Sequence, residues 1–228
     1  MEALSRTVYI VTMEVDPAWE DELNRWYDQE HLPALLGVPG YRGARRYVAV
    51  DGGPKYMAFW EIDSIDAFHS EARQRAINTP WSDRLRPYRR SQFAVYEQVN
   101  PPEGVMRGPA WGEPEAGLMV IRIDVGPQHE ADFNAWYDDE HLPALAAVPG
   151  VISARRFRAI EGEPKYMAVY SLVSPEVQAS APWKQAIDTP WSARVRQTFL
   201  TRWRTVYRPL GPRIEAPTAT PDARSVGG

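Results

Sequence analysis

The sequence predicts an α+β protein made of two βαββαβ units, with the helices of both units on the outside. The main observation is an internal repeat, because residues 26–60 match residues 136–170 at 22 of 35 positions without a gap. Strand-like and helix-like hydrophobic patterns also follow each other in the same order in both halves. A length of 228 residues suits two small domains of about 100 residues each.

Local signals define the elements of the first half. Thr7–Val15 is β-branched and apolar, as strands are, and Asp16 and Pro17 are suited to cap and begin the helix that follows. Pro33 is expected to end that helix, because the residue before a proline avoids the α region. The other expected elements are strands at 41–50 and 55–62, helices at 65–78 and 81–88, and a strand at 92–99.

The second half repeats this order after a linker rich in proline and glycine. We expect strands at 117–125, 151–160, 165–172 and 201–207, and helices at 130–141, 175–188 and 189–198. The predicted domains are residues 1–99 (first repeat), 100–116 (linker), 117–210 (second repeat) and 211–228, a tail whose composition predicts disorder. Each sheet would have one face without helices. We therefore expect the two sheets to meet face to face in one chain, as an intramolecular pseudo-dimer that could also build a larger homo-oligomer.

The composition excludes several classes of function. The formal net charge is −4 without long blocks of like charge, so nucleic acid is not an expected partner. There are no cysteines, which removes thiolate nucleophiles and fits a reducing compartment. The first residues do not form a signal peptide and no apolar run is long enough to span a bilayer. We therefore expect a cytoplasmic location and no membrane partner.

The repeat contains an eight-residue motif, Trp-Tyr-Asp-x-Glu-His-Leu-Pro, at residues 26–33 and again at residues 136–143. The two copies differ only in Gln29 and Asp139. Each copy places two aromatic rings, at least two carboxylates and one imidazole within a short helical segment. This mixture suits acid–base chemistry, but it also suits a buried helix end.

The motif, the duplicated βαββαβ order and the Val-Pro-Gly turn before the next strand resemble the dimeric α+β barrel superfamily, and most closely its EthD-like branch. The resemblance covers residues 7–99 and 117–207. It implies that two fused ferredoxin-like repeats form an intramolecular dimeric α+β barrel, in place of a homodimer of one-repeat subunits. The superfamily includes cofactor-free monooxygenases, muconolactone-type isomerases, polyketide cyclases and dehydratases, and haem enzymes. The fold therefore leaves the reaction open.

His31 and His141 are the candidates for acid–base catalysis, because imidazole exchanges protons near neutral pH. Asp28 and Asp138 lie three residues earlier, which on a helix is close enough to orient the ring. The alternative is a structural role, in which these polar groups cap a helix end and the aromatic rings belong to the core.

Arg45 and Arg155 each begin an arginine pair near the start of the second predicted strand of their half. Adjacent strand residues face opposite ways, so one arginine of each pair could point into a pocket. An inward guanidinium could stabilise an oxyanion during catalysis. The alternative is a salt bridge to an acidic residue of the motif.

We expect an aromatic pocket between the helices and the sheet of each half. The candidate lining residues are Trp26, Tyr27, His31 and Trp81 in the first half, and Trp136, Tyr137, His141 and Trp191 in the second. The structural alternative for Trp81 and Trp191 is packing against the first helix of the half. His69 is a further substrate-binding candidate, and because its counterpart is Ala179, the first half is favoured as the active one.

No metal and no other cofactor is expected. The chain has four histidines and no cysteines, and no two histidines occur at His-x-His or His-x-x-x-His spacing. The alternative is haem with His69 or His31 as axial ligand, because haem enzymes occur in the superfamily.

Three classes of function remain open, and each involves a small molecule. The first is a cofactor-independent lyase, isomerase or cyclase that uses histidine acid–base catalysis on an oxygenated, aromatic or polyketide-like metabolite. The second is a cofactor-free monooxygenase of the same fold. The third is a non-catalytic binding or accessory protein.

Overall fold

The structure, a computed structural model, describes residues 4–217 and has the predicted mixed α+β composition. The first half contains β1 (Thr7–Val15), the 3₁₀ turn η1 (Pro17–Trp19), α1 (Glu20–Trp26), the π-helical turn η2 (Tyr27–His31), α2 (Leu32–Leu36), β2 (Tyr41–Asp51), β3 (Tyr56–Ile62), α3 (Ile65–His69), α4 (Glu71–Ile77), α5 (Pro80–Leu85), η3 (Arg86–Tyr88) and β4 (Arg89–Asn100). The second half contains β6 (Gly117–Val125), η4 (Pro127–His129), α6 (Glu130–Trp136), η5 (Tyr137–His141), α7 (Leu142–Ala146), β7 (Val151–Glu161), β8 (Tyr166–Leu172), η6 (Pro175–Ala179), α8 (Ala181–Ile187), α9 (Pro190–Arg196) and β9 (Phe199–Pro209). Two short strands, β5 (Met106–Arg107) and β10 (Ile214–Glu215), lie outside these halves.

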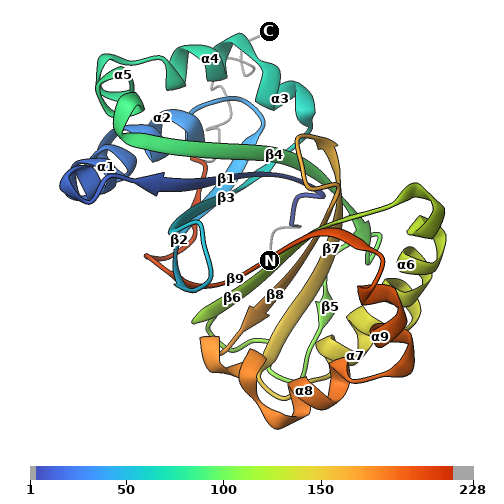
Figure 1. The fold of residues 1–228 in the computed structure, drawn as a ribbon. Helices are drawn as coiled ribbons and strands as arrows, with labels where there is room; N and C mark the ends of the chain where they lie inside the picture. The colour runs from blue at the N-terminus through green and yellow to red at the C-terminus, as the bar shows by residue number, and fades with distance from the viewer. Residues whose placement is uncertain (1–3, 218–228) are drawn as a thin grey trace, which may run out of the picture.

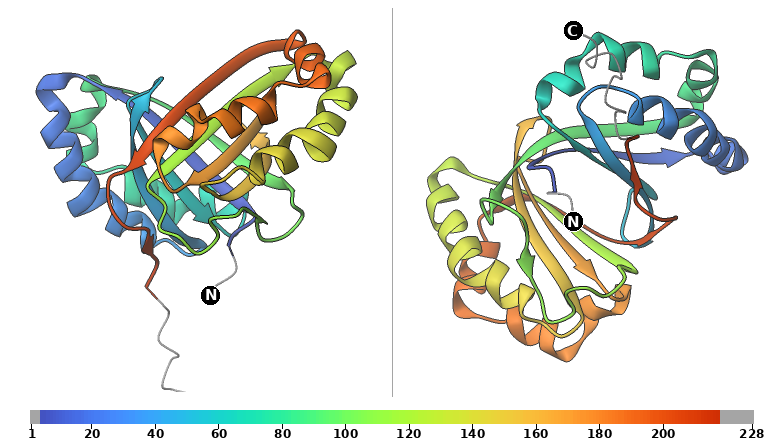
Figure 2. Two further views of the ribbon diagram at one scale, coloured as in Figure 1. Left: turned by 90° about the horizontal axis from the view of Figure 1, so that it is seen from below. Right: turned by 180° about the vertical axis from the view of Figure 1, so that it is seen from behind.

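The eight long strands close into an antiparallel barrel in the order β2-β3-β1-β4-β7-β8-β6-β9, because β2 also pairs with β9. Helices cover the barrel on two opposite sides (Figure 1 and Figure 2). The helix-free faces of the two halves face each other as expected, but they line one closed barrel and are not two separate stacked sheets. The pairs β4–β7 and β2–β9 join the edges of the halves by hydrogen bonds, which leaves no open sheet edge at either joint.

Three clusters of buried apolar side chains follow from this closure. One cluster fills the barrel interior with side chains from both halves, such as Val8, Ile10, Leu118 and Val120. The other two lie outside the barrel, each between the sheet and the helices of one half. Within residues 4–217, no helix has the length and the apolar composition needed to cross a bilayer.

Pro33 does not end the first helix, which is a correction to the sequence prediction. The chain widens into the π-helical turn η2, where the backbone N–H of Leu32 bonds to the carbonyl of Tyr27, five residues earlier. Pro33 then occupies one of the first two positions of α2, where a missing N–H costs little, and the helix ends at Gly37. The predicted helix 65–78 is instead divided, because the Ser70 side chain caps a new helix, α4.

The predicted disorder of the tail is wrong for residues 211–217. The strand β10 pairs with β2, and the Arg213 guanidinium donates to the buried carboxylate of Glu61. Residues 218–228 lie outside the described part of the chain. The linker is also more regular than expected, because β5 pairs with β7.

We expect Arg213→Ala to lower the free energy of unfolding by about 1–3 kcal/mol, because a buried carboxylate loses a charged donor. The side chain of Glu61 is 7% exposed, and the nearest guanidinium that would remain is that of Arg155, at 3.8 Å. Urea titration would measure the loss. Arg75→Ala is the control, because its pair with Glu71 is exposed and should contribute less than about 1 kcal/mol. Equal losses in the two variants would contradict this account of the C-terminal segment.

Candidate functional site

The aspartates of the two motifs pair with arginines and not with the histidines. Asp28 accepts a hydrogen bond from Arg46 at 2.8 Å, and Asp138 accepts one from Arg156 at 2.9 Å. Both guanidinium groups are buried under the first helix of their half. Asp28 and Asp138 therefore do not orient an imidazole through its Nδ1, which has no hydrogen-bond partner in His31 or in His141. The alternative that we gave for the arginine pairs, a salt bridge to an acidic residue of the motif, is therefore the one that applies to Asp28 and Asp138.

The glutamates of the motifs also have structural partners. Glu30 accepts a hydrogen bond from the hydroxyl of Thr79, the residue that caps α5, and from the indole N–H of Trp26. Glu140 accepts one from Thr189, the cap of α9, at 2.6 Å. These bonds tie the motif to the helix that precedes the last strand of each half. The Nδ1 atom of each imidazole is left as a buried polar atom of the motif without a hydrogen-bond partner in the described residues.

The two histidines are buried against the aromatic rings of their own motifs. The ring of His31 stacks on Trp26 at a centroid distance of 4.2 Å, and that of His141 stacks on Trp136 at 4.0 Å. Burial, and after it the charge of neighbouring arginines, lowers the pKa of each histidine to about 3. For His141 these arginines are Arg196, Arg202 and Arg156. Both imidazoles are thus neutral at physiological pH and can accept a proton.

The second half contains a cavity of about 280 Å³ between its sheet and its helices, and His141 is part of the wall. Its lining is mostly apolar and aromatic, with four basic side chains. The lining residues are Met119, Ile121, Ile123, Trp136, Tyr137, His141, Leu145, Gln178, Ala179, Trp183, Lys184, Ile187, Arg196, Phe199, Arg202 and Arg204. Trp136, Tyr137 and His141 are three of the four residues that we expected to line a pocket in this half, and the fourth, Trp191, does not line this cavity.

Larger side chains fill the corresponding space in the first half. The guanidinium of Arg73 lies 3.8 Å from the centroid of the Phe68 ring, and that ring packs on Tyr9 at 4.9 Å. Phe68 and Arg73 are both buried. Their counterparts by sequence offset are Gln178 and Trp183, which line the open cavity. The structure thus favours the second half as the functional one, contrary to the preference drawn from His69.

His69 lies at the surface, where its Nε2 is 2.6 Å from a carboxylate oxygen of Glu161 on β7. This surface position and the hydrogen bond to Glu161 do not suit a substrate-binding residue or a haem ligand in a cavity. His31 is enclosed by Trp26, Tyr27 and Trp60, so its position does not suit an axial haem ligand either. Within the described residues, no group of three or more histidine or acidic side chains is arranged to hold a metal ion.

Trp81 and Trp191 pack against the first helix of their half and do not line the cavity described above. The indole N–H of Trp81 donates to Glu22 at 2.8 Å, and that of Trp191 donates to Asp132 at 2.9 Å. The structural alternative is thus the correct one for both tryptophans. Trp183, from α8, takes the place in the cavity wall that we predicted for Trp191.

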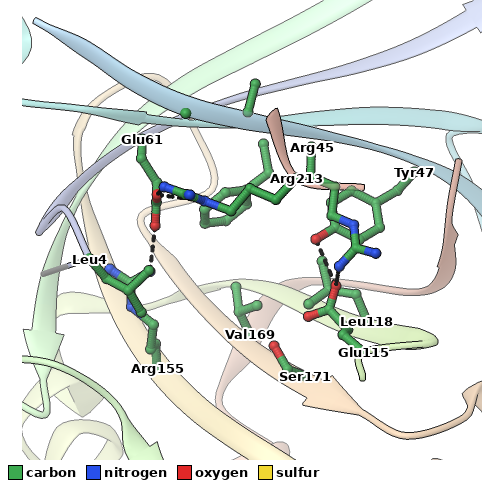
Figure 3. Close-up of a pocket in the computed structure, with 13 residues that line it drawn as sticks. Leu4, Arg45, Tyr47, Glu61, Glu115, Leu118, Arg155, Val169, Ser171 and Arg213 are labelled. Carbon is green, nitrogen blue, oxygen red and sulfur yellow. Dashed lines mark hydrogen bonds and ion pairs between the residues drawn. The ribbon is translucent and has the colours of Figure 1, made fainter. Parts of the chain in front are cut away.

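Arg45 and Arg155 face the interior of the barrel, while the next residue of each pair faces the helices. They line a separate cavity of about 150 Å³ at one end of the barrel (Figure 3). Arg45 donates to Glu115 at 3.0 Å, and Arg155 donates to the side chain of Gln98 at 2.6 Å. One arginine of each pair therefore reaches a cavity as predicted, but it is not the cavity of the histidine. An oxyanion role for Arg45 or Arg155 beside a motif histidine does not fit this arrangement.

Sequence reasoning missed four residues of the site: Trp183, Arg196, Phe199 and Arg202. They come from α8, α9 and β9, and in α8 and β9 the two halves of the chain have few identical residues. The replacement of Arg73 by Trp183 was a visible signal, because it exchanges a cation for a large aromatic ring at equivalent positions.

No model of a known protein family matches the sequence. No curated protein matches it at the sequence level. Solved structures do resemble it. An anthrone oxidase-like protein has a TM-score of 0.64 at 14% identity, with 98% of this chain and 97% of that chain covered. A variant of chlorite dismutase from Candidatus Nitrospira defluvii has a TM-score of 0.61 at 12% identity, with 89% and 91% covered. A protein from Lactobacillus acidophilus NCFM, provisionally named a monooxygenase, has a TM-score of 0.54 at 10% identity, with 89% and 93% covered.

At these identities the similarities establish the fold alone, a closed antiparallel barrel with helices outside, which is consistent with a dimeric α+β barrel. The matches extend over almost the whole of each compared chain, so both halves and the closure between them take part. The site has to be judged from its own geometry.

The buried histidines should make stability depend on pH in a defined direction. Each folded-state pKa of about 3 lies below the ordinary 6.5, so the unfolded chain takes up the proton first and stability falls as the pH drops from about 6.5 towards 3. His141→Asn should reduce the slope of unfolding free energy against pH by up to about 1.4 kcal/mol per pH unit. Urea titrations at pH 7, 6, 5 and 4 would measure it. The exposed His129→Asn is the control. An unchanged slope in His141→Asn would show that folding does not lower the pKa of His141.

Proposed function

We propose that the cavity of the second half is the active site of a cofactor-independent enzyme, which removes a proton from a small, oxygenated, aromatic molecule. His141 is the proton acceptor. The observation that supports this proposal is a neutral imidazole in the wall of an aromatic cavity, in a motif whose carboxylates all belong to structural bonds or to the exposed surface.

The chemistry follows from the surroundings of His141. Trp136, Tyr137 and Trp183 offer flat apolar surfaces to an aromatic ring, and they exclude water from the reacting atoms. Burial raises the pKa of Tyr137 to about 12, so its phenol stays protonated and can donate a hydrogen bond to a substrate oxygen. Transfer of a proton from the substrate to His141 creates an anion next to an imidazolium, and these two charges stabilise each other in a low-dielectric site.

The first candidate for the overall reaction is the one expected from the sequence, a lyase, isomerase or cyclase. The substrate anion would eliminate a group, return the proton at another carbon, or close a ring, and none of these outcomes needs another reactant. General acid–base catalysis of this kind contributes about 10²–10⁴-fold to a rate.

The second candidate is a cofactor-free oxygenase, and the names of the fold neighbours favour it. In an anthrone-like substrate, His141 would take a proton from an activated CH₂ group and the carbanion would add O₂. The resulting hydroperoxide loses water and leaves a carbonyl. One CH₂ group and one O₂ thus become one C=O group and one H₂O.

The tandem arrangement fits a fused pair of EthD-like repeats that replaces a homodimer, and we extend the proposal to that origin. A small molecule is the expected partner in every case. If a ligand binds in the cavity and is recovered unchanged, the protein is a binding or accessory protein. The cytoplasmic location stays a prediction.

We expect His141→Gln to reduce turnover by about 10²–10⁴-fold, because it removes the proton acceptor and keeps a polar side chain of similar size. His31→Gln is the matched control, since His31 occupies the same position of the motif in the half whose cavity is filled. It should change turnover less than threefold. Circular dichroism and the thermal midpoint would verify that both variants fold. Near-wild-type turnover by the His141 variant would refute the catalytic role.

Oxygen uptake should separate the two candidate reactions. Anthrone and 1-naphthol, incubated with the wild-type protein, would be followed by absorbance and with an oxygen electrode. The oxygenase candidate predicts one O₂ consumed per carbonyl formed and no product under argon. Product that forms equally fast under argon would instead assign the protein to the lyase, isomerase or cyclase class.

A further inference from the structure

The polar side chains around the cavity of the second half have one sign of charge. Four basic residues take part in the lining, namely Lys184, Arg196, Arg202 and Arg204, and no acidic residue does. This excess is unusual for a chain whose formal net charge is −4. A positive rim around an apolar cavity attracts anions and concentrates them at the entrance.

One of these four side chains is neutralised by a carboxylate of the protein, and the other three are not. Arg204 donates to Asp51 at 2.7 Å and also to Gln178, so its charge is compensated. Arg196 donates to the backbone carbonyl of Ile187 at 2.6 Å, which leaves its charge without a carboxylate. The side chains of Arg202 and Lys184 have no hydrogen bond or ion pair with another residue of the segment 4–217.

The interior of the same cavity is apolar. Ile121 and Ile123 on β6 and the rings of Trp136, Trp183 and Phe199 form its wall. A ligand that satisfies both parts needs a flat hydrocarbon body and an acidic group at one end. A guanidinium holds a carboxylate better than it holds a neutral oxygen, because the pair is charged and both hydrogen bonds can form at once.

We propose that this cavity binds aromatic carboxylates, with the carboxylate held by Arg202 and Arg196 at the rim and the ring placed between Trp183 and Trp136 beside His141. This inference rests on the function proposed above, because it names the substrate class of the same site. Arg202 is the residue that determines specificity, and His141 is the residue that reacts.

The first half provides an internal comparison. Arg202 pairs with Ile123 in the barrel, and the equivalent pairing in the first half joins Met13 to Ser91, so a serine stands where the arginine does. Two arginines act most strongly on His31, and both lie against rings of the first half. Arg73 is buried against Phe68, and Arg89 lies 4.3 Å from the centroid of the Trp26 ring and donates to the hydroxyl of Ser82. Arg196 has an arginine counterpart, Arg86, so Arg202 is the arginine of the proposed carboxylate site that distinguishes the half with the open cavity.

An anionic ligand would also improve His141 as a base. Arg196, Arg202 and Arg156 contribute to its low pKa, after burial. A carboxylate bound to two of these arginines offsets their charge and moves the pKa of His141 back towards its ordinary value. A general base works best when its pKa lies close to the working pH, so the charge of the substrate would prepare the site for the proton transfer.

The test uses 1-naphthoate and its neutral analogue 1-naphthamide, which differ in charge and hardly in shape. Isothermal titration calorimetry of the wild-type protein should show naphthoate binding at least about tenfold more tightly than naphthamide, a ratio typical of one charge-assisted contact. Arg202→Gln should remove most of this preference and leave naphthamide binding unchanged. Arg202→Lys should keep part of it, and Arg208→Gln, on the same strand but outside the cavity lining, should keep all of it.

A further variant locates the site. Gln178→Phe introduces the ring that fills the first half, so it should abolish naphthoate binding without unfolding the protein. The proposal is overturned if the wild-type protein binds the two compounds equally or binds neither. It is also overturned if Arg202→Gln weakens both equally, or if Gln178→Phe still binds naphthoate.

These outcomes are separate from those that concern catalysis. His141→Gln should still bind naphthoate, so a protein that binds aromatic carboxylates through Arg202 but converts none of them would refute the proposed enzyme and not this inference. Conversely, turnover of neutral substrates that depends on His141 but not on Arg202 would refute the inference and leave the enzyme.

Discussion

The hydrogen bonds between β4 and β7 and between β2 and β9 determine where every functional side chain lies. They close the two sheets into one barrel, so each strand has one face towards a shared interior and one face towards helices. Residues that are adjacent on a strand then belong to different environments. Arg155 enters the barrel-end cavity, while Arg156 passes under α6 and holds Asp138. The site with the histidine is consequently outside the barrel, between sheet and helices.

The order of elements could be predicted from the sequence because the repeat doubles each signal, and strand and helix periods differ clearly. Two kinds of detail could not be predicted from the sequence. The helix continues past Pro33 because a π-helical turn accommodates the proline, and no residue pattern announces such a turn. The segment around Arg213 is ordered because Glu61, more than 150 positions earlier, is buried and needs a donor, which composition does not reveal.

The sequence predicted only part of the candidate site, because the remaining contacts join residues that are far apart in the chain. The motif correctly located the buried imidazole of His141 among aromatic rings. The partners of its carboxylates were not predicted. Helix spacing suggested that Asp138 would contact His141 within the motif, but Asp138 pairs with Arg156 on β7, and Glu140 pairs with Thr189, the cap of α9. Whether a half has a cavity depends on side-chain volumes on α3, α4 and α8, and the two halves have few identical residues in these segments.

A comparison of the two halves shows what the motif contributes to packing and what it could contribute to chemistry. Both bury a neutral imidazole whose Nδ1 has no partner, and this burial is unfavourable wherever it occurs. In the first half, Phe68 and Arg73 fill the adjacent space, so the stacking of His31 on Trp26 can only contribute to packing. In the second half, the same stacking holds His141 at the wall of a cavity with a positive rim. If the motif contributed only to packing, side chains would be expected to fill the space beside the imidazole in both halves. A chain that keeps one of them open, with uncompensated arginines at its entrance, has the arrangement expected of a site that admits an anionic molecule and then exchanges a proton with it.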